Sequence, residues 1–72
     1  MTYQNLVNTD DRPYVVIVCK SIDTKPTAGA RYVITDHGRA WIPEKYIGVI
    51  EWYADGAVID LPRWLAESKG II

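Results

Sequence analysis

The stretch WIPEKYIGVIEWYADGAVIDLP, residues 41–62, decides the fold, because it holds a hairpin between two prolines. Asp55 and Gly56 separate VIEWY from AVIDL, two runs rich in β-branched and aromatic residues. An Asp-Gly pair between such runs is typical of a tight β-hairpin. Pro43 and Pro62 lack the amide hydrogen that a strand interior needs, so we expect the strands to end near them.

Two further strand regions precede this hairpin. The run YVVIVCK, residues 14–20, is β-branched and apolar on both faces, which predicts a central strand. Residues 21–29 collect Ser, Asp, Thr, Pro and Gly and predict a long loop. Residues 31–35 and 39–42 flank the sequence DHG, where Gly38 is expected to supply the positive φ of a tight turn. These two runs are therefore expected to pair as antiparallel neighbours.

The end of the chain predicts a short helix. Asp60 or Leu61 is expected at its start, and Gly70 suits the left-handed position after its last turn. Trp64 and Leu65 are expected to anchor this helix to the sheet.

About five strands and one C-terminal helix predict a mostly β fold, either a small five-stranded antiparallel barrel or a strongly bent sheet, of SH3-like or OB-like size. The chain has 72 residues, so one domain is expected. We assign residues 14–72 to this domain. Residues 1–13 are polar and lack a clear period, and they are expected to form an N-terminal arm, either loosely held or paired as a short edge segment.

Composition narrows the classes of function. Eight basic and nine acidic residues give a net charge of −1, which argues against non-specific binding to duplex nucleic acid. Cys19 lies in an apolar run and is expected to pack in the core, and His37 has no histidine or cysteine partner at zinc-ligand spacing. No nucleophile, paired carboxylates or phosphate-binding loop is recognisable, so the sequence predicts a protein without catalytic residues, metal or cofactor.

The start of the chain, MTYQNLVNTDDRP, lacks the basic and apolar segments of a signal peptide. Its longest apolar run is far shorter than the ~20 residues of a membrane span. The expected location is the cytoplasm, with no membrane partner.

The aromatic residues allow two interpretations. In the strand VIEWY, Glu51 is expected to face water, which places Tyr53 on the same face and sends Trp52 inward. Trp41 and Val58 are expected to join Tyr53 in an outward apolar patch. Either the helix or the N-terminal arm covers this patch, or the patch is exposed and binds a partner, since Trp and Tyr are common in interface hot spots.

The segments ARYVITDHGRAWIPEKYI and IDLPRWLAESKGII resemble a group of small proteins from tailed phages and prophages. Their pattern has a hairpin that ends in W-[IL]-P-x-S-x-I and a terminal P-x-W-[IL]-A-x-x-K-G-[LI]. The tail WLAESKGI, residues 64–71, is the most specific part of the match, whereas Lys45 and Tyr46 stand where the pattern has Ser and Gln. The resemblance implies a setting among genes for replication, recombination or host takeover, inside the bacterial host, and implies no established activity.

The favoured hypothesis is a non-catalytic binding module that contacts a host or phage protein of DNA metabolism or defence, as an inhibitor or accessory factor. The alternative is an accessory protein for single-stranded nucleic acid, in which aromatic side chains stack on bases beside basic residues. Self-association into a homodimer through an uncovered patch or an open strand edge is a third alternative. The predicted binding residues are Trp41, Lys45, Tyr46, Tyr53, Arg39 and Arg31.

Overall fold

The computed structural model describes residues 13–72, so most of the predicted arm, residues 1–13, lies outside the described part. The described chain is mostly β with one C-terminal helix, as the sequence predicts. Its strands form two antiparallel sheets with the orders β1-β6-β5 and β2-β3-β4. The elements are β1 (Tyr14–Cys19), β2 (Ser21–Ile22), β3 (Ala30–Ile34), β4 (Arg39–Pro43), the 3₁₀ turn η2 (Glu44–Tyr46), β5 (Ile50–Tyr53), β6 (Gly56–Pro62) and α1 (Arg63–Lys69).

A β-bulge between β1 and β2 joins the two sheets. Ser21 is the register partner of Ile34, and the backbone amide of Lys20 also donates to the Ile34 carbonyl, at 2.7 Å. Two residues therefore oppose one, which bends the strand and raises its local twist. Before the bulge the strand pairs with β6, and after it the strand pairs with β3.

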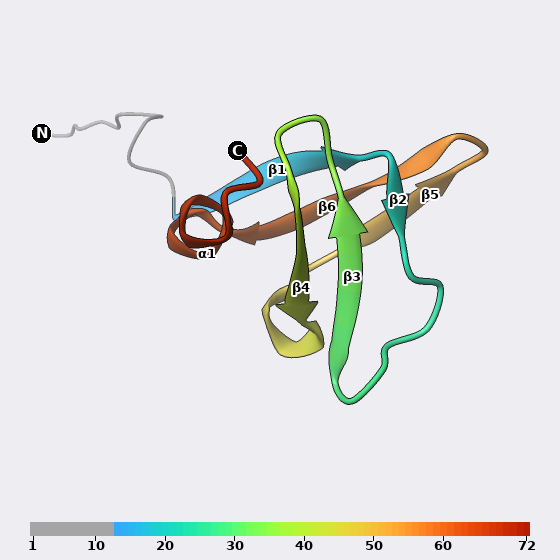
Figure 1. Cartoon of the computed structure of the whole chain (residues 1–72), viewed down its shortest axis with the longest axis horizontal. Coiled ribbons are helices and arrows are strands. Elements are labelled where there is room, and N and C mark those ends of the chain that lie inside the picture. The colour runs from blue at the N-terminus through green and yellow to red at the C-terminus, as the bar shows by residue number, and fades with distance from the viewer. Residues whose placement is uncertain (1–12) are drawn as a thin grey trace, which may run out of the picture.

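Because of this bend, the sheet of β2, β3 and β4 crosses in front of the sheet of β1, β6 and β5 (Figure 1). Both sheets, α1 and the C-terminal tail contribute buried side chains to one core. Its largest fully buried side chains are Val33, Ile42, Ile59, Leu61, Ile71 and Cys19. Each sheet turns its second face away from this core.

The strands do not close into a barrel in the described part, and six strands replace the five that were predicted. The additional strand, β2, lies inside residues 21–29, which were predicted as a loop. Its pairing with β3 follows from the bulge, which has no simple sequence signal. The run YVVIVCK was predicted to be a central strand, but β1 lies at the edge of its sheet and β6 is central.

The hairpin of β5 and β6 forms as predicted, with its turn one residue earlier. Tyr53 pairs with Gly56, so Ala54 and Asp55 make the turn instead of Asp55 and Gly56. A Cβ atom on Gly56 would lie 2.3 Å from the Cys19 carbonyl oxygen. Glycine is required at this position because two backbones approach each other closely.

The predicted pairing of residues 31–35 with 39–42 is also confirmed by the pairing of β3 with β4. Gly38, however, does not have the expected positive φ. A Cβ atom there would lie 2.7 Å from the carbonyl oxygen of Gly70, which does adopt the left-handed conformation after α1. Close packing of the 35–38 turn against the C-terminal tail explains this glycine.

Helix α1 begins later than the sequence suggested. Asp60, Leu61 and Pro62 remain in β6, which pairs with β1 up to the partners Pro62 and Tyr14. The amide of Arg63 then donates to the Pro13 carbonyl at 2.8 Å. Continued pairing therefore satisfies a backbone donor that a side-chain cap would otherwise serve.

The approach of Gly38 to Gly70 predicts that Gly38→Ala lowers the free energy of unfolding by about 1–3 kcal/mol, the usual cost of overpacking. Gly48→Ala is the control, since a Cβ atom there meets the Asp60 side chain at an ordinary 3.5 Å. Urea unfolding of both variants measures the difference. Equal stability of the two variants would contradict the tight packing of the tail.

Candidate functional site

The outer face of the sheet β1-β6-β5 carries an exposed apolar surface, which we call the valine face. Register pairing places alternate residues of the three strands on this face. Val16 and Val18 are 67% and 73% exposed, and Tyr53 is 57% exposed. The apolar members of the valine face are Tyr14, Val16, Val18, Val49, Tyr53 and the half-buried Val58.

The charged residues at outer positions of this sheet are acidic. Glu51 is the register partner of Val58, and Asp60 is the register partner of Val16. The Tyr53 hydroxyl donates to a Glu51 carboxylate oxygen at 3.3 Å. An apolar surface that carries carboxylates repels phosphate and suits a protein partner.

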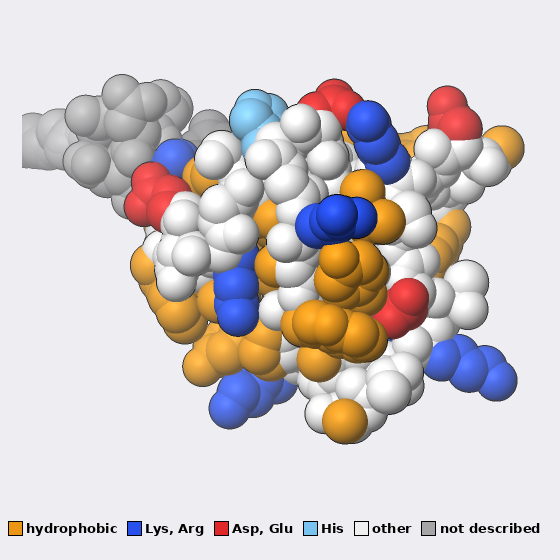
Figure 2. All heavy atoms as spheres, in the orientation of Figure 1, with side chains coloured by type: hydrophobic (Ala, Val, Ile, Leu, Met, Phe, Trp, Pro, Cys, Tyr) orange, Lys and Arg blue, Asp and Glu red, His pale blue; other side chains and the backbone are white. Residues whose placement is uncertain are grey.

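The outer face of the sheet β2-β3-β4 carries a smaller surface, which we call the aromatic face. Tyr32 and Trp41 are register partners whose rings lie 5.1 Å apart, and Trp41 is 49% exposed. Arg39 lies two residues from Trp41 on the same face of β4 and is exposed. Figure 2 looks onto this side of the molecule, where hydrophobic side chains gather over β3 and β4 beside basic ones.

The predicted patch of Trp41, Tyr53 and Val58 does not exist as one surface. Trp41 belongs to the sheet β2-β3-β4, whereas Tyr53 and Val58 belong to β1-β6-β5. The two sheets share one core and expose opposite faces, so the patch is divided between the valine face and the aromatic face. Trp41 and Tyr53 are both exposed, and α1 covers neither of them.

Two other predicted residues, Lys45 and Tyr46, lie on η2. The Lys45 ammonium sits 5.3 Å from the centre of the Tyr46 ring, and the Trp64 ring approaches the same ring edge-on, with 5.4 Å between the ring centres. Trp64 is 56% exposed and does not anchor α1 to the sheet, contrary to expectation. Leu65 and Ala66 provide that anchor. Trp64 instead links α1 to η2.

Trp52 was predicted to point into the core, yet it is about half exposed. It pairs with Ala57 near the tip of the β5–β6 hairpin. Figure 1 shows this hairpin extending past β3 and β4, so no facing sheet covers its tip.

Arg31 is a structural residue and not a free phosphate ligand. Its guanidinium donates to both carboxylate oxygens of Glu44, at 2.5 and 3.3 Å, and to the Asp23 carbonyl at 2.8 Å. The Glu44 hydrogen bond raises the pKa of Arg31, and the same bond lowers the pKa of Glu44. These bonds use three of the five guanidinium N–H donors, and the Glu44 carboxylate balances the charge that the nucleic-acid alternative would need.

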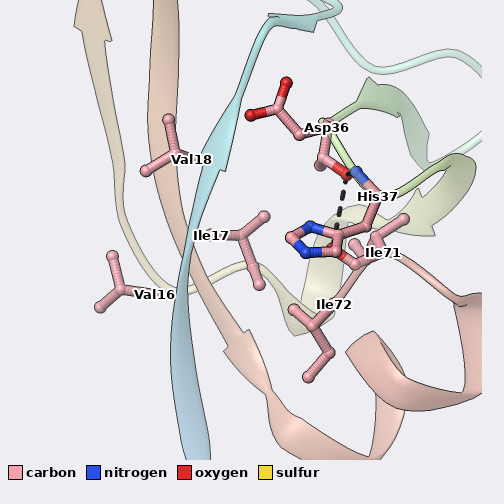
Figure 3. A pocket seen from close by; sticks show the side chains of 8 residues that line it. Val16, Ile17, Val18, Asp36, His37, Ile71 and Ile72 are labelled. Carbon is pink, nitrogen blue, oxygen red and sulfur yellow. Dashed lines mark hydrogen bonds between the residues drawn. The ribbon is translucent and has the colours of Figure 1, made fainter.

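A groove of about 230 Å³ runs beside β1 (Figure 3). Ile17 points toward it from β1, while Ile71, Ile72 and His37 form the opposite wall. Its volume lies below the ~300 Å³ at which pockets for small molecules begin. It therefore fits side chains better than a cofactor.

Few side chains in residues 13–72 have the properties of a nucleophile or a metal ligand. Burial raises the pKa of the Cys19 thiol to about 11, so the thiolate needed for nucleophilic attack is scarce at neutral pH. No group of three His, Cys, Asp or Glu residues within these residues has the arrangement of a metal site. The one helix of this part of the chain is too short to cross a bilayer.

Comparisons of the chain with models of protein families, with curated proteins and with solved structures give no match.

Sequence reasoning placed Trp41 and Tyr53 on outward strand faces and left open whether they are covered, and it missed Val16, Val18 and Tyr32. The sequence holds no signal for the two valines, since β1 is apolar at every position although its side chains differ in exposure. Apolar residues on both faces indicated a buried strand more readily than a half-exposed one.

The Arg31–Glu44 pair predicts a pH dependence of stability. Because the folded pKa of Glu44 lies below its unfolded value of about 4.3, the pair stabilises the fold above that pH. This stabilisation is lost as the pH falls through the lowered folded pKa. We therefore expect Glu44→Gln to be less stable than the wild type at pH 7 and equally stable in acid. Urea unfolding at both pH values tests this, and a difference that persists in acid would contradict it.

Proposed function

We propose that this protein is a small non-catalytic binding module that acts through the valine face on a partner protein. The observation that carries the proposal is the exposure of Val16, Val18 and Tyr53 on one sheet face whose charged neighbours are acidic. Exposed apolar patches of this kind mark interaction surfaces in small proteins. The tyrosine ring offers a large contact area at low entropic cost, which suits a hot spot.

The setting that we propose comes from the resemblance to small phage and prophage proteins. The tail that carries the resemblance is buried in part: Leu65, Ala66 and Ile71 belong to the core. Its pattern is therefore compatible with a shared way of closing the fold and does not define a partner. The partner in this proposal is a host or phage protein of DNA metabolism or defence, met in the bacterial cytoplasm.

Affinity capture with the tagged protein from host and phage-infected lysates tests this function. We expect a specific protein to be retained after nuclease treatment, and Tyr53→Ala to reduce its recovery several-fold, since hot-spot truncations cost about 2 kcal/mol or more. Trp41→Ala is the matched control, because Trp41 is similarly exposed on the opposite face. Equal recovery with Tyr53→Ala and wild type would reject the valine face.

A second candidate function, binding of single-stranded nucleic acid, is favoured by the aromatic face. Tyr32 and Trp41 offer adjacent rings for base stacking, and Arg39 offers a positive charge. Asp23, however, lies close by, since its carboxylate accepts the Tyr32 amide at 3.1 Å. Only one of the predicted basic residues, Arg39, stands beside these rings, because Arg31 is paired with Glu44 and Lys45 lies on η2.

Titration of a fluorescent single-stranded oligonucleotide tests this candidate. If the aromatic face binds it, Trp41→Ala should weaken binding by about fivefold or more, since a stacked base is worth about 1–3 kcal/mol. Arg39→Glu should also weaken binding, because it reverses a charge beside the phosphates, and the affinity should fall steeply with salt. Tyr53→Ala serves as the control and should have no effect. An affinity that does not respond to salt would exclude this function.

A further inference from the structure

The outer edge of β1 exposes unpaired backbone groups. The Arg63 amide bonds to Pro13, and the alternation of an antiparallel pair then places Val15, Ile17 and Cys19 in hydrogen-bonded pairs with β6. The amides and carbonyls of the intervening residues therefore point away from β6. These residues are Tyr14, Val16 and Val18.

Two observations support this assignment. Lys20, the next residue in the same alternating series, donates its amide to Ile34 of β3, on the side away from β6. On β6, the amide and carbonyl of Asp60 bond to Val49 and Gly48 on the side of β5, away from β1. The edge is thus closed by β3 at Lys20 and has no hydrogen bond to another described residue at Tyr14, Val16 or Val18.

This edge lacks three of the features that usually prevent strand addition. The edge strand β5 has four residues and contains Glu51, and the edge strand β4 begins with Arg39 and ends with Pro43. In contrast, β1 has six residues, YVVIVC, without a charge or a proline. Charge, proline and short length are three ordinary protections of an edge, and β1 has none of them. The bulge at Lys20 and Ser21, another such feature, comes only after the last residue of β1.

The groove beside this edge can receive side chains from an added strand. Its far wall is held in place because the Thr35 hydroxyl lies 3.4 Å from the Ile71 carbonyl and Gly38 packs on Gly70. Ile17, Ile71 and Ile72 give it an apolar lining (Figure 3). A strand that pairs with Val16 and Val18 would place alternate side chains over this lining.

The charged side chains along β1 indicate which charge an added strand should carry. The charged side chains that line the hollows along this strand are Asp36, Asp55 and Asp60, together with Lys20. Lys20 is already paired with Asp36 at 3.2 Å. The net charge along β1 is therefore negative. A second copy of the chain would bring the same carboxylates and an uncharged β1, so it does not complement this negative charge.

We propose that β1 accepts an extended segment of the partner protein as an additional strand, and that this segment alternates apolar and basic side chains. The apolar side chains enter the groove at Ile17, Ile71 and Ile72. The basic side chains lie on the outer face, with their methylene stems over Val16 and their charged ends toward Asp60. This inference rests on the proposed function, because it identifies the part of the partner that the valine face holds.

A capped seven-residue peptide of alternating lysine and valine is the probe, added to the ¹⁵N-labelled full chain and followed by NMR. We expect saturable shifts centred on the amides of Val16 and Val18. Replacing every lysine of the peptide by glutamate should weaken binding at least tenfold at low salt. In the protein, Asp60→Asn should weaken binding of the lysine peptide, whereas Glu67→Gln, an equal change of charge on the exposed side of α1, should not.

Two N-methylated isomers of the same peptide test strand addition itself. Methyl groups on all valine amides remove the donors of one strand edge, and methyl groups on all lysine amides remove those of the other edge. One isomer should bind with the affinity of the parent peptide, and the affinity of the other should fall tenfold or more. Equal binding of both isomers would exclude backbone pairing.

Other outcomes are equally decisive. The absence of saturable shifts on β1 would overturn the inference. It would also be overturned by a dimer without peptide, seen by sedimentation, in which the amides of Val16 and Val18 are protected from hydrogen exchange. If Tyr53→Ala abolishes capture of a protein while the peptide fails to bind, the proposed function stands and the strand-addition inference falls. If the peptide binds as described but capture is insensitive to Tyr53→Ala, the edge is the site and the wider valine face is not.

Discussion

The bulge at Lys20 and Ser21 is the constraint on which the rest of the structure depends. Both residues oppose Ile34, so one continuous segment pairs with β6 before the bulge and with β3 after it. This bend allows two three-stranded sheets to share one core in a chain of only 72 residues. It also separates β3 from the first part of β1, which leaves the edge of β1 open beside a groove.

The two outward faces differ in chemistry because different strands supply their side chains. The valine face combines aliphatic and tyrosine side chains with Glu51 and Asp60. The aromatic face pairs Tyr32 with Trp41 beside Arg39. A surface on which carboxylates lie among apolar side chains suits a protein with basic and apolar side chains, which is why the proposed function uses the valine face. Both faces remain exposed because each sheet packs only one of its sides against the shared core.

The sequence predicted local features better than long-range ones. The β5–β6 hairpin, the pairing of β3 with β4 and the left-handed Gly70 follow from turn residues and short-range pairing, and all are present. The bulge was missed because it depends on Ile34, fourteen residues away from Lys20. The roles of Gly38 and Gly56 were misassigned for the same reason, since each is set by a distant backbone carbonyl.

In the candidate site, too, the sequence predicted local features better than long-range ones. Alternation along a strand correctly placed Tyr53 outward, but it also placed Trp52 in the core, because a sequence does not show where a hairpin extends past the facing sheet. Arg31 was assigned to a binding surface. Its partner Glu44 lies on η2, thirteen residues further along the chain, and the sequence does not show that this turn packs beside β3. Exposure of Val16 and Val18 depends on which strand lies at the edge, and this is a property of the topology.

Amide hydrogen exchange along β1 tests the central claim most directly, because it reports the pairing of each residue in turn. An open edge predicts fast exchange at Val16 and Val18 and slow exchange at Val15, Ile17 and Cys19, which bond to β6. Slow exchange at all five amides would mean that the edge is already covered, and the open-edge account would be wrong.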